Sequence, residues 1–272
     1  MSAVTRTSDQ KRTTILLVKR IDFNFGVGRL LGSVFFLLLH VLQPSFAQTL
    51  GVPKAAFAPK VGTWNYRSES NVGEKQKTNS VATYSTTVKD AGDAWTVTVA
   101  MKFPEGPVTG VGTLDKGTLI LRKVSFRHFV HPDQRWKPVA IDLDFKGNRV
   151  TGTSTNANEQ TKSLAFDLTG PIFADVKSLI TIGCLPLADG YSTTVRDWDV
   201  LGLQERLWQL KVLGTERVTV PAGTFDTYKV ELTATDATGD KQTAWIDKDV
   251  RVPVKIDAVD KLYGVIRTEM VP

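Results

Sequence analysis

Apolar and polar residues alternate most clearly between Val218 and Ile256, a stretch that contains three alternating runs joined by two loops. The middle run is typical of a strand that is buried on one side. Its apolar positions are Tyr228, Val230, Leu232 and Ala234, and its polar positions are Thr227, Lys229, Glu231 and Thr233. The loops contain Pro221-Ala222-Gly223 and Ala237-Thr238-Gly239. We therefore expect two three-residue hairpin loops, each closed by a glycine bulge with a positive φ.

The same alternation continues along most of the chain after residue 60 and predicts a series of short strands. These further strands are expected at residues 63–67, 83–89, 95–101, 118–129, 138–145, 149–153, 164–168, 191–200, 206–220, 252–256 and 262–269. Residues 118–129 form one long continuous run among them. One interval differs, because Ile172, Val176 and Leu179 are spaced as on a helix face behind Pro171. We expect a helix of about three turns over residues 171–182.

Many short strands with a single helix predict a mainly β protein. Wide, twisted sheets curl, so we expect a curved antiparallel sheet or half-barrel with the one short helix packed on its concave face. The composition does not shift again after residue 60, which favours one β-rich domain over residues 61–272. A division near residue 170 is the alternative. Residues 48–60 contain two prolines and no periodicity, and are interpreted as a linker or an extended lead-in.

Residues 1–47 have the features of a secretory signal peptide. A mostly apolar run from Leu30 to Leu42 follows Arg29, and Ser45 and Ala47 supply the small residues of a cleavage site. An uncleaved membrane anchor is the alternative, but the run is shorter than the roughly 18–20 apolar residues that a membrane span needs. We therefore expect a periplasmic mature chain that does not span the membrane, and a translation start downstream of Met1.

The charge of the chain is concentrated at its N-terminus. The 34 basic and 28 acidic residues give a formal charge of +6, and residues 1–47 contain six of the basic and two of the acidic ones. The remainder carries 28 basic and 26 acidic residues, a net charge of about +2, with no cluster of Lys and Arg interleaved with aromatic residues. Such a chain attracts phosphate weakly, so we expect no binding to nucleic acid.

Few residues offer chemistry. Cys184 is the only cysteine, and its apolar context ITIGCLPL predicts a buried small residue rather than a nucleophile. His128 and His131 with Asp133 are the most metal-like group, yet residues 128 and 131 of a strand point to opposite faces, so we interpret this segment as a solvated loop.

Carboxylates also recur two residues apart, so that each pair would share one strand face, as paired acid–base chemistry requires. These pairs are Asp142/Asp144, Asp197/Asp199 and Asp247/Asp249. A water-facing side of a strand explains them more simply. We assign no catalytic, cofactor-binding or metal-binding residue, and we expect no cofactor.

Several segments of the chain, taken in order, resemble the bacterial domain of unknown function 3108 family. They are Leu185-Pro186-Leu187-Ala188-Asp189-Gly190-Tyr191, Leu210-Lys211-Val212-Leu213-Gly214-Thr215-Glu216, VPAGTFDTYKVEL, AWID and VRVPVKI, together with the upstream strands at 118–126 and 142–153. The resemblance covers most of the predicted mature chain, and PAGTFDTYKV is its most specific part. It implies an exported, β-rich envelope protein with a shape like that of the lipoprotein carriers, in which a curved sheet wraps an apolar cavity. It implies no catalytic residues.

Three hypotheses of function follow. The leading hypothesis is a non-enzymatic, exported envelope protein that binds a lipid or another apolar ligand in a concave sheet, or that serves envelope assembly. The second is a carboxylate-dependent hydrolase or carbohydrate-active module, with Asp142 and Asp144 as the first candidates. The third is an envelope protein that binds a partner protein by strand addition at a sheet edge.

Overall fold

The structure is a computed structural model, and it describes residues 51–71, 79–103, 105–130, 137–173, 178–260 and 264–272. The predicted signal peptide lies outside these residues. Fourteen strands account for most of the described chain. They are β1 (Gly62–Asn71), β2 (Asn79–Asp90), β3 (Ala94–Phe103), β4 (Gly106–Asp115), β5 (Leu121–Arg127), β6 (Pro138–Lys146), β7 (Arg149–Asn156), β8 (Thr161–Asp167), β9 (Ser192–Asp199), β10 (Gln204–Val220), β11 (Gly223–Ala234), β12 (Lys241–Asp247), β13 (Pro253–Asp260) and β14 (Gly264–Val271). The one α-helix within the described ranges, α1, is Ile180–Gly183.

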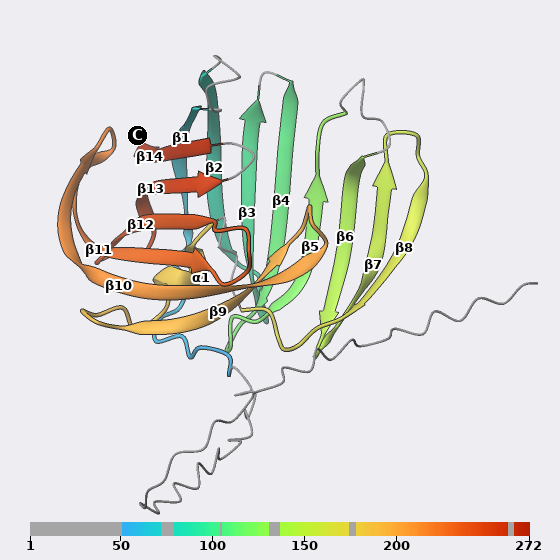
Figure 1. Ribbon diagram of the computed structural model, residues 1–272, viewed down its shortest axis with the longest axis horizontal. Coiled ribbons are helices and arrows are strands. Elements are labelled where there is room, and N and C mark those ends of the chain that lie inside the picture. The colour runs from blue at the N-terminus through green and yellow to red at the C-terminus, as the bar shows by residue number, and fades with distance from the viewer. Residues whose placement is uncertain (1–50, 72–78, 104, 131–136, 174–177, 261–263) are drawn as a thin grey trace, which may run out of the picture. The chain divides into compact units, whose positions relative to one another are not determined.

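All fourteen strands belong to one antiparallel sheet that is not closed into a barrel (Figure 1). Its order is β8-β7-β6-β5-β4-β3-β2-β1-β14-β13-β12-β11-β10-β9. The first eight strands follow one another as a meander, the last six form a second meander, and β1 pairs with β14 to join the two. The two edges of the sheet are therefore β8 and β9, which are consecutive strands in the chain.

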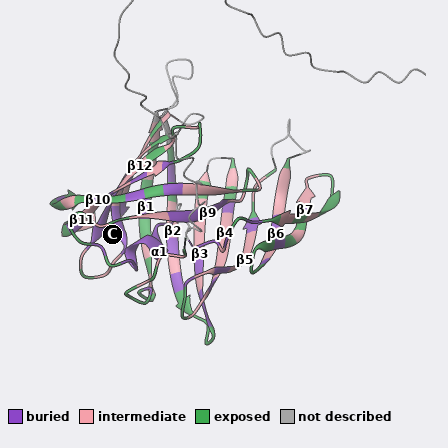
Figure 2. Ribbon diagram, turned by 60° about the horizontal axis from the view of Figure 1, so that its bottom comes forward, coloured by how far each residue is buried: buried purple, intermediate pink, exposed green. Residues whose placement is uncertain are grey.

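The sheet is curved so strongly that one of its edges packs against the opposite end. In Figure 1 the strands of the C-terminal meander cross in front of those of the N-terminal meander. Trp198 of β9 packs against Phe145 of β6 and Phe166 of β8, with ring centres 5.6 Å apart in both pairs. Tyr66 of β1 donates a hydrogen bond from its hydroxyl to the carbonyl of Pro253 in β13. The β9 edge thus lies inside the curve of the sheet, and Figure 2 shows buried residues along it.

The apolar core lies on the concave face. The register places Leu143 of β6, Val124 of β5, Val97 of β3 and Val88 of β2 on one face, with Gly112 of β4 between Val124 and Val97. Apolar side chains continue along that face into the C-terminal meander. Helix α1 is buried within this curve, and all four of its residues are buried. The prediction of a curved antiparallel sheet with a short helix on its concave face is confirmed.

The predicted length of the helix is wrong. We expected a helix over residues 171–182, but only Ile180–Gly183 is helical, and residues 174–177, with Val176, lie outside the described residues. Phe173 instead donates its N–H to the carbonyl of Arg196 in β9, and Ile172 accepts from the N–H of Leu121, the first residue of β5. These bonds to strands hold residues 172 and 173 in a non-helical conformation, and Leu179 has a φ of 57°, at which a right-handed helix cannot continue.

Two further expectations need correction. The run at 118–129 forms a strand only over Leu121–Arg127, because the Asp115 carboxylate accepts hydrogen bonds from residues 117 and 118 and folds a turn there. The hairpin loops also differ in length from three residues, since Val220 pairs directly with Gly223, and six residues separate β11 from β12. Gly223 and Gly239 do have the expected positive φ, at 141° and 71°.

No helix among the described residues is long and apolar enough to cross a membrane.

Candidate functional site

Strand β9 carries a charged side chain into the interior. Residues 195–198 are all buried, so both faces of the strand are covered. Val195 and Asp197 occupy one face, and Arg196 and Trp198 occupy the other, because successive side chains of a strand alternate. The Arg196 side chain is only 8% exposed. Arginine is rarely buried to this extent without a partner, so its surroundings define the first candidate site.

Glu205 of β10 is the counter-charge of Arg196, but the two are not hydrogen bonded. The Glu205 Oε2 lies 3.7 Å from the Arg196 Nε. Both Glu205 oxygens accept hydrogen bonds from Thr169, one from its backbone N–H at 2.9 Å and one from its hydroxyl at 2.6 Å. Among the described residues, the Nε–H of Arg196 has no hydrogen-bond acceptor. The buried arginine therefore has a neighbouring negative charge and an unused donor.

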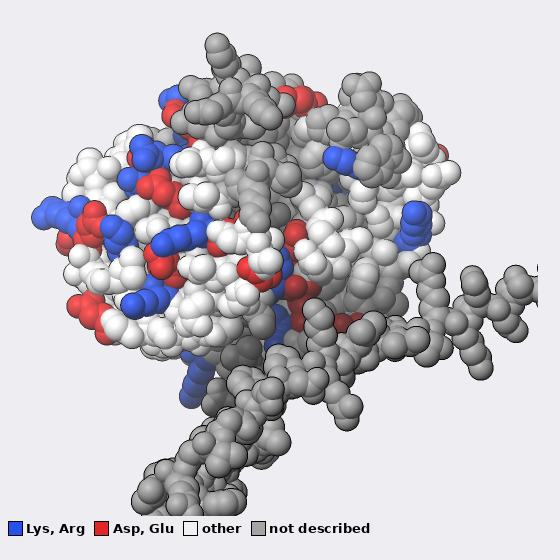
Figure 3. Space-filling model, in the orientation of Figure 1, with Lys and Arg blue, Asp and Glu red and all other residues white. Residues whose placement is uncertain are grey.

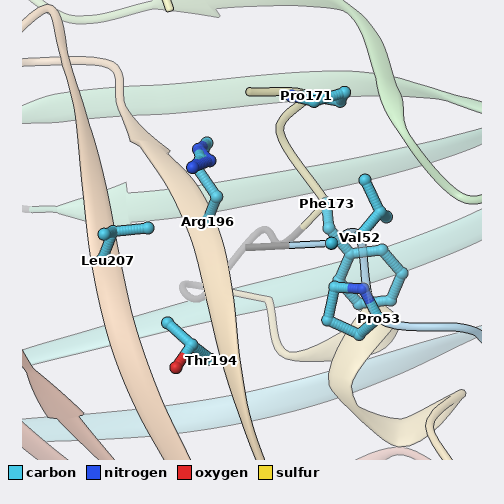
Figure 4. Close-up of a pocket in the computed structure, with 8 residues that line it drawn as sticks. Val52, Pro53, Pro171, Phe173, Thr194, Arg196 and Leu207 are labelled. Carbon is cyan, nitrogen blue, oxygen red and sulfur yellow. The ribbon is translucent and has the colours of Figure 1, made fainter. Parts of the chain in front are cut away.

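A small pocket adjoins this arginine (Figure 4). Arg196, Thr194 and Leu207 project from β9 and β10 on one side, and Phe173, Val52 and Pro53 lie on the other. Gly51 and Pro171 complete the lining. The cavity volume is about 10 Å³, which is room for about one water molecule. The pocket can hold one small polar group, and it is far smaller than the several hundred Å³ of a typical ligand site.

The chain's own lead-in covers this region, and we call residues 51–59 the strap. The backbone N–H groups of Ala56 and Phe57 donate to the carbonyl of Cys184, at 2.8 and 3.1 Å. Val52 and Ala55 pack against the apolar core. The strap is thus held by main-chain hydrogen bonds and apolar contacts.

A second arginine fixes the other end of the strap. The Arg251 Cζ lies 4.0 Å from the centre of the Phe57 ring and 5.1 Å from that of Tyr228. Its Nη1 is buried and has no hydrogen-bond acceptor among the described residues. Two guanidinium groups with an unused donor therefore lie along one short segment of chain.

Cys184 is a buried small residue, as predicted. It is 1% exposed, and burial raises the pKa of its thiol to about 12. Its Sγ donates to the carbonyl of Ile180. A thiol that stays protonated at physiological pH does not act as a nucleophile.

The second candidate site is the β8 edge of the sheet. Asn156 donates to the carbonyl of Gln160, and Leu168 donates to the carbonyl of Asn148, so the even-numbered residues of the β8 segment bond to β7. Bonding direction alternates along an antiparallel strand. The N–H and C=O groups of the odd-numbered residues therefore point away from the sheet. These residues are Thr161, Ser163, Ala165 and Asp167, and all four are exposed.

The two edges of the sheet differ in their backbone pairing. At the β9 edge, the carbonyl of Arg196 accepts from the N–H of Phe173, and the strand is buried on both faces. At the β8 edge, no described residue pairs with the outward groups of Thr161–Asp167. The structure therefore has one covered edge and one free edge.

Of the predicted carboxylate pairs, Asp142 and Asp144 lie side by side on the outer face of β6, as expected. Asp142 accepts two hydrogen bonds from the Arg127 guanidinium, at 3.0 and 2.9 Å, and Asp144 lies 3.3 Å from the Lys123 ammonium. Both carboxylates are about half exposed. These cross-strand ion pairs account for both residues, and the hypothesis of a hydrolase stays a prediction.

The other two pairs serve turns. Asp199 accepts from the N–H groups of residues 201 and 202, and Asp247 accepts from those of residues 249 and 250. Asp249 lies beyond the end of β12, so it does not share a strand face with Asp247 as we expected. Asp197 is buried next to Arg196 in sequence but on the opposite face.

His131 and Asp133 lie outside the described residues. His128 stacks against Phe129, with ring centres 4.2 Å apart, and one of its ring nitrogens lies 2.8 Å from the Phe129 carbonyl oxygen. The described part of the chain contains no group of three or more potential metal ligands.

Charges of both signs are interspersed on the face shown in Figure 3. The outer side of the C-terminal meander illustrates this arrangement, because Glu216 lies 3.1 Å from the Lys229 ammonium and accepts a hydrogen bond from the indole of Trp245. These bonds, the Trp245 one above all, lower the pKa of the Glu216 carboxyl. The described residues visible on this face form no basic patch, and the absence of nucleic-acid binding stays a prediction.

The sequence did not reveal Arg196, Arg251 or the strap as parts of a site. Arg196 sits in the run STTVRDWD, where its position predicts a side chain on one face of a strand and gives no sign that both faces are covered. The proline-containing composition of residues 48–60 predicted a linker or an extended lead-in, but not what this segment covers.

Comparisons with known proteins assign the sequence to a family. The model of a family described as a protein of unknown function (DUF3108) matches residues 63–271. No curated protein matches the chain. A protein with a YmcC-like fold from Bacteroides fragilis NCTC 9343 is 12% identical, with a TM-score of 0.33, covering 80% of this chain and 97% of its own. A DUF1329 family protein from Desulfovibrio piger ATCC 29098 is 10% identical, with a TM-score of 0.27, covering 76% and 82%.

Proposed function

The chain belongs to the DUF3108 family of proteins of unknown function, and from that premise we propose that it is an exported, non-enzymatic envelope protein that binds an extended segment of a partner protein along its β8 edge. One observation carries the proposal. The outward N–H and C=O groups of Thr161–Asp167 lack a partner among the described residues, while the opposite edge is covered. An extended peptide adds to such an edge through main-chain hydrogen bonds.

The chemistry of the edge suits a transient partner. Its four outward-bonding residues carry small or polar side chains, so nothing bulky blocks an incoming strand. The strand is seven residues long and includes Lys162 and Asp167, features that limit uncontrolled pairing between sheets. Leu164 and Phe166 are half-buried at the rim of the core, where an added strand would cover them further.

The concave face gives less support to a lipid-binding site than the β8 edge gives to strand addition. Core side chains on that face are largely buried, and the described pocket next to it has a volume of about 10 Å³. An acyl chain would need a rearrangement of the core to enter. Export rests on the predicted signal peptide, and the absence of a catalytic role rests on the ion-paired or turn-forming states of the candidate carboxylates.

Photo-crosslinking in intact cells tests the proposal. A benzophenone amino acid at Ser163, on the edge, should give an adduct with one envelope protein. The same residue at Thr151, which lies on the same outer face of the adjacent strand β7, should not. The control at Thr151 distinguishes a partner bound at the β8 edge from one bound on the outer face of the sheet.

A backbone substitution then identifies the mode of binding. Ala165→Pro removes only an outward N–H, so the hydrogen bonds to β7 stay intact. Ala165→Val alters the side chain and keeps the N–H. We expect the proline variant to lose the adduct and the valine variant to retain it. An adduct that survives Ala165→Pro, in a variant whose unfolding midpoint matches the parent's, would refute strand addition.

A further inference from the structure

The strap is a poor electrostatic match for the surface that it covers. Residues 51–59 read GVPKAAFAP, with one lysine and no carboxylate. Beneath them lie Arg196 and Arg251, each with a buried donor that has no acceptor among the described residues. A buried guanidinium donor without an acceptor is costly, and a carboxylate is its strongest acceptor. The surface is therefore better suited to an acidic occupant than to the strap.

The geometry at Arg196 shows where such a carboxylate would sit. The pocket beside Arg196 has room for about one water, which is also the room that one carboxylate oxygen needs. Gly51 lines this pocket, and a Cβ built on it meets no atom within 4 Å. Glu205 does not fill the position, because Thr169 holds both of its oxygens and its Oε2 lies 3.7 Å from the Arg196 Nε, too far for a hydrogen bond. A side chain that extends from the position of Gly51 therefore has space and an available donor.

The hydrogen bonds of the strap indicate which class of molecule can take its place on this surface. The carbonyl of Cys184, a residue only 1% exposed, accepts two main-chain N–H groups, from Ala56 and Phe57. An acyl chain in place of the strap would leave this carbonyl without a donor, whereas another peptide would supply both N–H groups. The apolar positions Val52 and Ala55 add side-chain contacts that a peptide can reproduce.

We infer that the surface beneath the strap is a binding site for an extended, acidic peptide segment, whose carboxylate bonds to Arg196, and that the strap is its resident, exchangeable occupant. The site lies at the β9 side of the sheet and is independent of the β8 edge. Because the strap is tethered, it competes at an effective concentration of the order of millimolar. An incoming segment therefore needs the carboxylate to gain an advantage.

The first test stays within one chain, using residues 48–272, which form one compact unit. Gly51→Glu should supply the missing carboxylate, and Gly51→Gln is the isosteric neutral control. Labelling of the buried Cys184 thiol is the readout, because the strap bonds to the carbonyl of this residue and its release removes two hydrogen bonds that hold the segment closed. We expect thiol labelling to be about tenfold slower in Gly51→Glu than in Gly51→Gln, the effect of one charge-assisted hydrogen bond. In an Arg196→Gln background the two variants should label at the same rate.

The second test adds the peptide separately. Phe57→Ala weakens the hold of the strap, and in this variant a fluorescent peptide of residues 51–59 with Glu in place of Gly51 should bind about tenfold more tightly than the same peptide with Gln. Arg196→Gln should abolish the difference.

Equal labelling of the two Gly51 variants, or equal binding of the two peptides, would overturn the inference. Displacement of the peptide by palmitate at a lower concentration than by unlabelled peptide would overturn the assignment to a peptide. Loss of the β8 crosslink in Ala165→Pro leaves these results unchanged, so the two sites are tested separately.

Discussion

The Arg251 guanidinium stacks on the ring of Phe57, with its Cζ 4.0 Å from the ring centre. This contact joins the strap to the turn between β12 and β13, and Gly183 of α1 lies against the backbone of the same arginine. Arg251 itself has a φ of 61°. Strap, helix and turn therefore meet at one residue, although the strap precedes the helix and the turn by more than a hundred residues in sequence.

Loss of the Phe57 ring should loosen the strap. Phe57→Ala removes a cation–π contact and partly buried apolar surface, and we expect a loss of about 1 kcal/mol in the free energy of unfolding, measured in urea. Phe57→Leu keeps the apolar bulk without the ring and should lose about half as much. If Phe57→Ala unfolds at the same urea concentration as the parent, the contact between the Phe57 ring and Arg251 contributes nothing to stability.

Cys184 should react only when the structure opens. Burial raises the pKa of its thiol to about 12, so the thiolate is scarce at pH 8 in the folded state. Labelling by a disulfide reagent at pH 8 should be slower by a factor of about 100 or more in the folded protein than in denaturant, because opening must come first. Similar rates in the two conditions would place the thiol at the surface.

Gly152 should tolerate no side chain. A Cβ at Gly152 would lie 1.9 Å from the backbone oxygen of Asp142 in the adjacent strand β6. We expect Gly152→Ala to destabilise the protein by about 3 kcal/mol or more, because a backbone atom must move. Gly110→Ala is the matched control, since a Cβ there meets no atom within 4 Å. Equal midpoints of thermal unfolding for the two variants would contradict the predicted clash at Gly152.

Asp236 gives the stability a dependence on pH. The Arg206 guanidinium, which donates to Asp236 at 2.9 Å, is the main reason that the pKa of this carboxyl falls from 3.8 to about 2. A lowered pKa means that the folded state favours the ionised carboxyl, so its contribution is complete above about pH 4 and is lost as the pH falls towards about 2.

The substitution Asp236→Asn should therefore destabilise the protein by up to about 1 kcal/mol at pH 7, an amount limited by solvent screening of this exposed pair. The difference from the parent should shrink between pH 4 and pH 2. Asp249→Asn, at an exposed carboxylate, is the control. A difference that is constant from pH 7 to pH 2 would contradict the assignment to the Arg206 pair.

The alternation of residues predicted most of the strands because one-sided burial leaves a period of two in the sequence. Val230 and Leu232 are fully buried, while Lys229 and Glu231 remain half-exposed, as the pattern predicts. The pattern failed at Thr227, which is also fully buried. It failed again over residues 171–182, because helical spacing at Ile172 and Leu179 reflects burial in the core and not a helix.

The candidate sites depend on contacts that a local pattern does not encode. Arg196 is buried because β9 packs inside the curve of a sheet whose other edge, β8, is formed by a separate segment, Thr161–Asp167. The β8 edge is free because the chain leaves the sheet after Asp167 and returns to it at the opposite edge. Local patterning gives the strands, while the order of the strands decides which edge is open.

Amide hydrogen exchange of β8 tests directly whether a partner strand adds to this edge of the sheet. In the protein alone, the amides of Leu164 and Phe166 should exchange slowly, because they bond to β7, and those of Ser163 and Ala165 should exchange fast. In the complex with the protein that crosslinks at residue 163, exchange at Ser163 and Ala165 should slow by a factor of about 100 or more. Fast exchange at these two amides in the complex would contradict strand addition at β8, and slow exchange in the protein alone would contradict a free β8 edge.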